Sequence, residues 1–214
     1  MKGYIFDMDG TIVDNMQYHY QAWKLFLQKY HIGLTDAEFE EKNTGTITEI
    51  IQRIFGNNLT PQQITTLCNE KEALFREMYA NNVVAINGYI QFIKSAHQQG
   101  IKIALATMAN VHNTNLVLDA LQIRPYFTAI ITGEMVAKGK PNPEVFFTAM
   151  DAMQLQKNEV VIFEDSPSGI AAALATKAMV VGVCTHFTIA QCLALGVQYA
   201  IIDYTNMPNL IGDE

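Results

Sequence analysis

The feature of this sequence that most constrains its fold is a series of short apolar runs, which recur along the chain and end in polar or acidic residues. The runs cover residues 4–6, 101–106, 129–131, 160–163, 180–183 and 200–202. Such runs are typical of strands buried in a parallel sheet. Segments with helical spacing separate most of them, at residues 88–99, 110–122, 143–154 and 167–177. Alternating strands and helices predict an α/β domain with a parallel sheet.

The stretch between the first two predicted strands is about ninety residues long and contains no good strand. Its apolar residues lie at steps of three and four, and Thr35 and Thr60 carry the signals of helix N-termini. One helix is enough to connect two parallel strands, but this pattern predicts four before the helix at 88–99. We therefore expect a helical domain over residues 15–83, inserted into a core domain formed by residues 1–14 and 84–214.

The charge balance narrows the range of partners. The chain has 14 basic and 21 acidic residues, a formal charge of −7, and no cluster of Lys and Arg. A phosphodiester backbone requires such a cluster, so we expect no nucleic-acid partner. The first apolar run is too short for a signal peptide, and apolar runs of about 18 residues are absent, so we expect no membrane association and a cytoplasmic location.

Polar residues that follow the predicted strands are candidates for a site, because ligands of parallel sheets bind at the carboxyl ends of strands. They are Asp7, Asp9, Thr107, Lys140, Glu164 and Asp165. Each fragment alone is also typical of an ordinary turn, in which Asp bonds the local backbone. Together, however, the carboxylates would repel one another unless a cation or a proton intervened. Hard oxygen ligands without Cys or His match Mg²⁺, and the hydroxyl and the amine suit a phosphoryl group.

Four motifs in order resemble the signature of the haloacid dehalogenase-like hydrolase superfamily. They are Asp7-x-Asp9-Gly10-Thr11, Thr107 after an apolar strand, Lys140-Pro141-x-Pro143 and Glu164-Asp165-Ser166. The resemblance covers nearly the whole chain. It implies a doubly wound, Rossmann-like α/β core with a helical cap inserted after the first motif.

The resemblance also implies a role for each matching residue. Asp7 would be the nucleophile that forms an aspartyl-phosphate, and Asp9 would protonate the leaving oxygen and then activate water. Thr107 would bind the phosphoryl group, and Lys140 would hold it beside Asp7. Lys138 is an alternative to Lys140, but only Lys140 directly precedes the Pro141-x-Pro143 turn.

The implied cofactor is Mg²⁺, bound by Asp7, the carbonyl of Asp9 and Asp165, with Glu164 as a ligand directly or through water. A dehalogenase needs its attacking aspartate without a second acid to protonate a leaving oxygen. The presence of Asp9 therefore points to phosphoryl transfer.

The inserted domain resembles the cap of β-phosphoglucomutases and related bacterial sugar phosphatases at residues 18–23. In that subgroup His19 would steady Asp9, although His19 equally fits a helix residue packed at the domain seam. Lys71 matches the cap lysine of the mutases, whereas Thr48 stands where a mutase has a phosphate-binding arginine. Further candidates for the inner face of the cap are Tyr18, Trp23, Thr44 and Thr46, although aromatic residues at helical spacing are commonly core.

We therefore predict a monomeric, Mg²⁺-dependent phosphatase that hydrolyses small phosphomonoesters, sugar phosphates first, through an aspartyl-phosphate. The alternative is a β-phosphoglucomutase that interconverts β-glucose 1-phosphate and glucose 6-phosphate, with Arg53 or Arg76 replacing the missing arginine. Pyrophosphate is a further candidate substrate. A phosphorylated receiver domain has similar residues, but the inserted helices and the spacing of Asp7 and Asp9 disfavour it.

Overall fold

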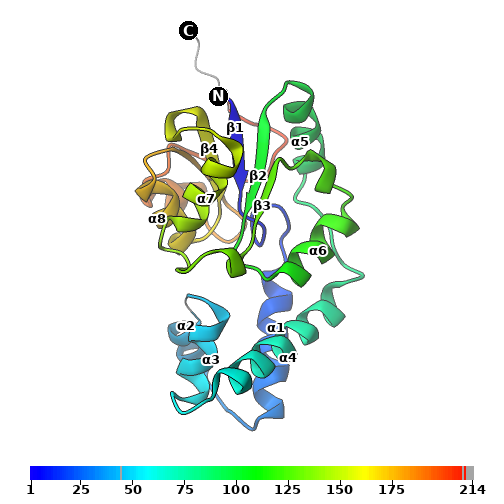
Figure 1. Ribbon diagram of the computed structural model, residues 1–214, viewed down its shortest axis with the longest axis vertical. Helices are drawn as coiled ribbons and strands as arrows, with labels where there is room; N and C mark the ends of the chain where they lie inside the picture. The colour runs from blue at the N-terminus through cyan, green and yellow to red at the C-terminus, as the bar shows by residue number, and fades with distance from the viewer. Residues whose placement is uncertain (44, 209, 211–214) are drawn as a thin grey trace. The chain divides into compact units, whose positions relative to one another are not determined.

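The computed structural model describes residues 1–43, 45–208 and 210, so Thr44 lies outside the described residues. Within this part of the chain, six parallel strands form one sheet in the order β3-β2-β1-β4-β5-β6. The strands are β1 (Gly3–Phe6), β2 (Lys102–Ala106), β3 (Ala129–Ile131), β4 (Val160–Glu164), β5 (Met179–Val183) and β6 (Tyr199–Ile201). The prediction of a doubly wound parallel sheet is confirmed (Figure 1).

Side chains alternate between the two faces of β1, and different helices cover each face. Ile5 points toward a core formed with α7 (Glu144–Met153) and α8 (Pro167–Ala175). Tyr4 and Phe6 point the other way, where they pack against aromatic residues of α5 (Tyr89–Gln98). Figure 1 shows α5 and α7 on opposite sides of the sheet. The sheet is therefore buried on both faces, which explains the continuous apolar runs.

An aromatic cluster fills the face that α5 covers. The ring of Phe6 stacks on that of Phe163 with centroids 4.5 Å apart, and Tyr89 meets Phe6 edge to face at 5.3 Å. Tyr204, which follows the last strand, packs against both Phe6 and Tyr89. The segment after β6 is thereby tied to the first strand.

The remaining elements of the core are α6 (Val111–Ala120), α9 (Ile189–Ala194) and three 3₁₀ turns at Arg124–Tyr126, Gly133–Met135 and Lys157–Glu159. Helix α9 was not predicted from the sequence. This helix is short, but Thr188 and Gln191 form a capping box at its start. That pair was the sequence signal for the helix.

The inserted segment is helical, with α1 (Met16–Lys29), α2 (Asp36–Lys42), α3 (Ile47–Phe55) and α4 (Pro61–Tyr79). Thr35 and Thr60 cap α2 and α4, and Thr46, a candidate for the inner face of the cap, instead caps α3. Each threonine accepts a hydrogen bond from the third helical N–H, so three otherwise unpaired amides are satisfied.

The chain divides into two compact units, Met1–Asp14 with Val83–Glu214 and Asn15–Asn82. The sequence-based boundary stood one residue later, after residue 83. The inserted unit has its own hydrophobic core, in which Phe26 and Ile51 are fully buried. Among the described residues, no helix is both long and apolar enough to cross a membrane.

Replacing Phe163 with Ala should destabilise the core unit by about 3–5 kcal/mol, because the fully buried ring leaves a cavity beside Phe6. Phe147→Ala is the control, since that ring is 42 % exposed and should cost well under half as much. Far-UV circular dichroism during urea unfolding measures both, because the single tryptophan, Trp23, lies in the inserted unit. Equal losses for the two variants would contradict the assignment of this core.

Candidate active site

The predicted site residues of the core gather where three neighbouring strands end. Asp7 follows β1, Thr107 follows β2, and Glu164 is the last residue of β4. The chain leaves β1 toward β2 on one side and later returns to β4 on the other, so the strand order reverses beside β1. Crevices at such reversal points are where open α/β sheets bind ligands.

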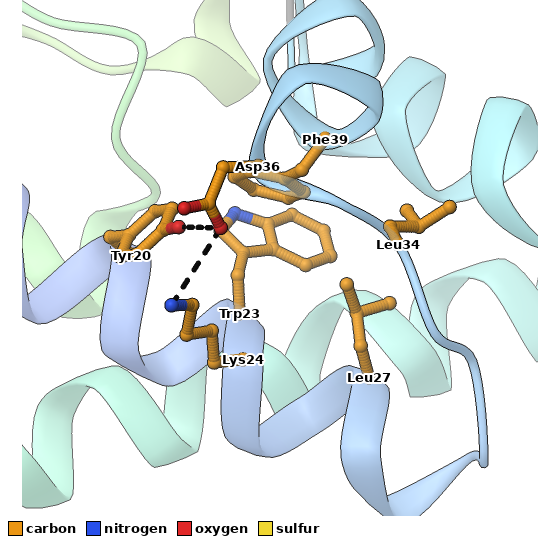
Figure 2. A pocket seen from close by; sticks show the side chains of 7 residues that line it. All are labelled: Tyr20, Trp23, Lys24, Leu27, Leu34, Asp36 and Phe39. Atoms are coloured by element: carbon orange, nitrogen blue, oxygen red, sulfur yellow. Dashed lines mark hydrogen bonds and ion pairs between the residues drawn. The ribbon is translucent and has the colours of Figure 1, made fainter.

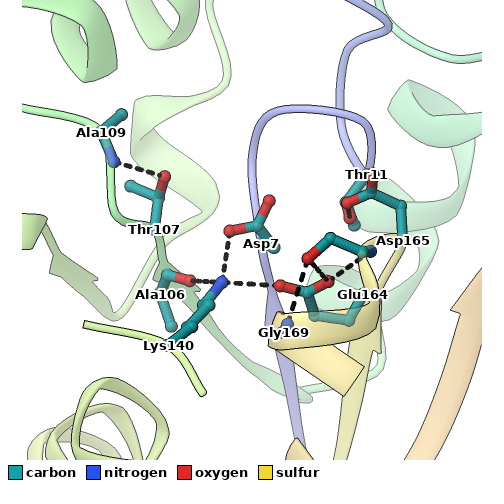
Figure 3. Close-up of polar contacts among 10 residues, drawn as sticks. Asp7, Thr11, Ala106, Thr107, Ala109, Lys140, Glu164, Asp165 and Gly169 are labelled. Carbon is teal, nitrogen blue, oxygen red and sulfur yellow. Dashed lines mark hydrogen bonds and ion pairs between the residues drawn. The ribbon is translucent and has the colours of Figure 1, made fainter. Parts of the chain in front are cut away.

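Lys140 is the central cation of this cluster. Its ammonium nitrogen donates to Asp7 Oδ1 at 2.5 Å and to Glu164 Oε1 at 2.7 Å, and it also reaches the carbonyl of Ala106 at 3.2 Å (Figure 3). The three acceptors lie at the carboxyl ends of β1, β2 and β4, so one side chain links all three strands. Lys140 is only 7 % exposed, and its three N–H groups match the three acceptors.

The competing candidate Lys138 lies elsewhere. Its side chain is exposed, and its backbone N–H donates to Glu144 at the start of α7. By contrast, the ammonium group of Lys140 lies 4.9 Å from the centroid of the Phe146 ring, which helps to shelter it from solvent. Only Lys140 of these two lysines contacts Asp7.

Three carboxylates lie close enough together to hold one cation. One oxygen from each of Asp7, Glu164 and Asp165 lies within 4.8 Å of the others, and all three residues are buried. Asp165 accepts a hydrogen bond from the hydroxyl of Thr11 at 3.1 Å. This oxygen-only set fits Mg²⁺ and contains no ligand that favours zinc.

The carboxylate of Glu164 accepts hydrogen bonds at both of its oxygens. Its Oε1 accepts from Lys140, while Oε2 accepts from the backbone N–H of Ser166 at 2.8 Å and from the Ser166 hydroxyl at 3.1 Å. Both carboxylate oxygens therefore already have donors. Gly169 makes this position possible, because a Cβ there would stand 1.7 Å from Glu164 Oε1.

Gly10 has a similar function beside Asp165. Its φ of +85° lies in the left-handed region, and an added Cβ would stand 2.0 Å from Asp165 Oδ2. The glycine therefore allows the loop after β1 to turn sharply and the Asp165 carboxylate to approach the backbone closely.

Burial controls the ionisation of this cluster. Burial raises the pKa of Asp7 to about 7; the Lys140 cation opposes this rise, and the carboxylates of Glu164 and Asp9 add to it. The pKa of Asp165 lies well above its usual range, mainly because of burial and then because of neighbouring carboxylates. Burial also disfavours the charge of Lys140, but the attraction of Asp7 and Glu164 outweighs it and raises the pKa of the amine.

The two other core candidates differ in exposure. Thr107 is buried, and its hydroxyl oxygen accepts from the N–H of Ala109 at 3.0 Å, so the hydroxyl can still donate its own hydrogen. Asp9 is half-buried and close enough to Asp7 to influence its charge. Asp7 and Asp9 therefore have different environments, as expected for carboxylates with different roles.

In the inserted unit, the side chain of Lys71 is buried, including its charged end. It is 2 % exposed, and its ammonium nitrogen donates to Glu72 Oε1 at 2.8 Å and to His19 Nδ1 at 3.0 Å. His19 also stacks on Phe75, with centroids 3.7 Å apart. Glu72, which is 7 % exposed, was not predicted as a site residue; the signal in the sequence was an acid directly beside a lysine on a buried helix face.

The structure places the other cap candidates in varied environments. Trp23 is 3 % exposed and packs against Phe26 and Phe39 in the core of the inserted unit. Thr48 is exposed at the start of α3. Their roles toward a substrate stay predictions.

Three further candidates, Tyr18, Arg53 and Arg76, also lie in the inserted unit. Tyr18 packs on Tyr79, with ring centroids 4.9 Å apart. Arg53, proposed as a substitute for the missing arginine, donates to the backbone carbonyl of Lys42. The second substitute, Arg76, is half-buried in the last turn of α4.

A small pocket opens between α1 and the segment that leads into α2 (Figure 2). Its polar part is formed by Asp36, which is bonded to Tyr20 and lies 3.7 Å from the ammonium of Lys24. Its apolar part is formed by Trp23, Leu27, Leu34 and Phe39. Most of these residues belong to the core of the inserted unit, so we regard the pocket as a packing crevice.

Comparisons with known proteins show the family of the chain. Residues 4–183 match the family model of the haloacid dehalogenase-like hydrolases. A fructose-1-phosphate phosphatase of Escherichia coli is 31 % identical, over 81 % of this chain and 91 % of the relative. A β-phosphoglucomutase of Bacillus subtilis is 29 % identical, over 86 % of this chain and 83 % of the relative.

Solved structures share the fold. A crystal structure of a HAD hydrolase from Entamoeba histolytica superposes with a TM-score of 0.88 and 23 % identity, and covers 98 % of this chain and 96 % of the other. At this identity the likeness establishes the architecture.

The metal-free protein should become less stable as the pH rises toward and through 7. The pKa of Asp7 is about 7 in the folded protein, against about 4 for an unfolded Asp, so the folded state holds a proton that the unfolded state has lost. The stabilisation from this proton is fully present below about pH 4 and is lost as the pH passes about 7.

Thermal unfolding with a chelator, followed at several pH values between about 5 and 8, measures this effect. Asp7→Asn is the control, because its neutral amide cannot titrate; its profile should fall less steeply than that of the wild type, and the raised pKa of Asp165 accounts for the remaining slope. A wild-type protein whose stability rises steadily over this range would contradict the raised pKa.

Proposed function

This chain belongs to the haloacid dehalogenase-like hydrolases, and we propose that it is a Mg²⁺-dependent phosphatase of small phosphomonoesters, with sugar phosphates as the first class to test. The observation that carries the proposal is the buried Asp7 carboxylate, which Lys140 holds at 2.5 Å within a group of three acids. A carboxylate so placed can attack a phosphoryl group once positive charge screens their repulsion.

The donor set supports Mg²⁺ as the cofactor. We propose Asp7, the carbonyl of Asp9 and Asp165 as its ligands. Because both oxygens of Glu164 already accept hydrogen bonds, we propose that Glu164 acts through Lys140 and through water. When bound, Mg²⁺ would supply positive charge that polarises a phosphoryl oxygen and offsets the repulsion between anions.

The proposed reaction has two steps on Asp7. In the first, a carboxylate oxygen of Asp7 bonds to phosphorus while the ester oxygen leaves and takes a proton from Asp9. In the second, Asp9 removes a proton from water, which attacks the phosphorus and releases inorganic phosphate and free Asp7. Lys140 and the Thr107 hydroxyl donate to the phosphoryl oxygens as negative charge shifts between them.

Two features of the inserted unit favour a phosphatase over a mutase. A mutase must hold a bisphosphate at both ends, and Thr48 lacks the forked donor of an arginine. The cation at Lys71 is offset by Glu72 at 2.8 Å, so this pair adds no net charge with which to hold a second phosphate. The similarity to a fructose-1-phosphate phosphatase points the same way.

A β-phosphoglucomutase is the second candidate, supported by the similarity to the enzyme of Bacillus subtilis. Pyrophosphate is a further candidate substrate. Location in the cytoplasm, a monomeric state and the lack of nucleic-acid or membrane partners stay predictions from the sequence.

Asp9→Asn should slow phosphate release from p-nitrophenyl phosphate by about 10²–10⁴-fold, because the amide can neither give nor take the proton. Asp14→Asn is the matched control, since this exposed acid pairs with His186 and has no proposed role in catalysis. The wild type should release many equivalents per protein, whereas a receiver domain would stop at one. Full activity in the Asp9 variant would contradict the proposed mechanism.

Phosphorus-31 NMR separates the two candidate enzymes. The protein is incubated with Mg²⁺ and β-glucose 1-phosphate, together with a trace of β-glucose 1,6-bisphosphate. We expect inorganic phosphate as the main product, because a phosphatase admits water to the aspartyl-phosphate. Accumulation of glucose 6-phosphate would instead establish a mutase.

A further inference from the structure

The loop that follows β1 carries the proposed nucleophile and the proposed acid, and its backbone is held by two kinds of hydrogen bond. Local bonds satisfy its N–H groups: those of Thr11, Ile12 and Val13 all donate to the carbonyl of Met8, and that of Gly10 donates to Val13. These bonds hold the loop in a tight turn. They do not fix the orientation of this turn relative to the sheet.

Bonds from distant parts of the chain contribute to that orientation; one is a backbone bond, from the N–H of Ile86 to the carbonyl of Ile12 at 2.8 Å, and two come from side chains. The hydroxyl of Thr185 donates to the carbonyl of Gly10 at 2.9 Å, and the hydroxyl of Tyr204 donates to the carbonyl of Thr11, also at 2.9 Å. Thr185 follows β5, and Tyr204 follows β6. We call these two residues the hydroxyl clamp.

The residue that the clamp holds is also in contact with a proposed metal ligand. Thr11 offers its carbonyl to Tyr204 and its side-chain hydroxyl to Asp165 Oδ1, at 3.1 Å. Next to it, the Cα of Gly10 lies so close to Asp165 that no side chain fits between them. A small shift of this peptide would therefore displace the Asp165 carboxylate.

Tyr204 is itself rigidly placed. Its backbone N–H donates to the carbonyl of Asn87 at 2.9 Å, and its ring packs between those of Phe6, Tyr89 and Phe92. Tyr204 is 4 % exposed, and burial raises the pKa of its hydroxyl well above the ordinary value. The hydroxyl therefore stays protonated and donates to Thr11.

We propose that Tyr204, assisted by Thr185, is a positioning residue for the metal site: it fixes the peptide of Thr11, whose hydroxyl sets the orientation of Asp165. The inference rests on the proposed function for the identity of the metal. It assigns a role to the segment after the last strand, which contributes none of the four motifs. Tyr204 acts through Thr11 and touches neither the metal nor the substrate.

The same aromatic cluster contains a matched control. The hydroxyl of Tyr89 is buried and has no hydrogen-bond partner among the described residues, and its ring lies 5.1 Å from that of Tyr204. Tyr204→Phe and Tyr89→Phe thus remove the same atom from neighbouring sites, but only the first breaks a bond to the loop.

The test is isothermal titration calorimetry of MgCl₂ into the metal-free, full-length protein at one fixed pH and salt concentration. Tyr204→Phe should raise the Mg²⁺ dissociation constant roughly two- to ten-fold, the usual effect of one hydrogen bond. Tyr89→Phe should leave it unchanged. Thr185→Val should weaken Mg²⁺ binding in the same direction, and it serves as the second variant if Tyr204→Phe does not fold.

A double-mutant cycle tests the route through Thr11. If Tyr204 acts through the Thr11 hydroxyl, Tyr204→Phe should add little to the loss of Mg²⁺ affinity already caused by Thr11→Val. Full additivity would overturn this route. Thermal unfolding without Mg²⁺ distinguishes the positioning role from a purely structural one. A purely structural role would lower the stability of the variants but not their affinity for Mg²⁺.

The outcomes distinguish the two proposals. If the wild type binds Mg²⁺ and Tyr204→Phe binds it equally well, the positioning role is wrong and the phosphatase proposal is unaffected. If the wild type binds Mg²⁺ but hydrolyses no phosphomonoester, the proposed function fails while calorimetry still decides the role of Tyr204. A wild type that binds no Mg²⁺ overturns both the proposed cofactor and the positioning role.

Discussion

The buried contact of Lys140 with Asp7 and Glu164 is the interaction on which the site depends. Carboxylates gathered in a low-dielectric environment repel one another, and Lys140 offsets part of that repulsion by donating to two of them, Asp7 and Glu164. Such a group is costly to bury, and removing one partner would leave an uncompensated charge. The arrangement is better explained by chemistry than by stability, because replacing a buried ionic group with apolar residues of similar volume is often neutral or stabilising.

The fold supplies what this cluster requires. Parallel strands bring their carboxyl ends to one edge of the sheet, so residues that are distant in the sequence lie close together there. The rest of the sheet is apolar on both faces, and its aromatic and aliphatic layers hold the strand ends rigid. Two glycines, Gly10 and Gly169, then allow backbone and carboxylate to approach more closely than any side chain would permit.

The inserted unit shows a different balance of charge. Its buried cation, Lys71, is satisfied inside the unit by Glu72 and His19. A pair of this kind is suited to orienting polar groups, whereas an unpaired cation would be suited to binding a second anion. Lys140 differs, because its acceptors include the proposed nucleophile. Lys140 is therefore the proposed catalytic cation, whereas Lys71 would contribute to substrate choice.

The sequence by itself determined the strands, most of the helices and the order of the four motifs, because these features depend on neighbours within a few residues. Apolar runs predicted the sheet, capping boxes predicted the starts of α2 and α4, and Asp7 and Asp9 stood out at the end of a strand. The short helix α9 was missed because it is too short for its apolar residues to repeat at helical spacing over several turns. The orientations of Glu164, Glu72, Thr185 and Tyr204 were decided only by the tertiary structure. A hydrogen bond between residues such as Tyr204 and Thr11, which lie 193 positions apart, leaves no spacing in the sequence from which it could be predicted.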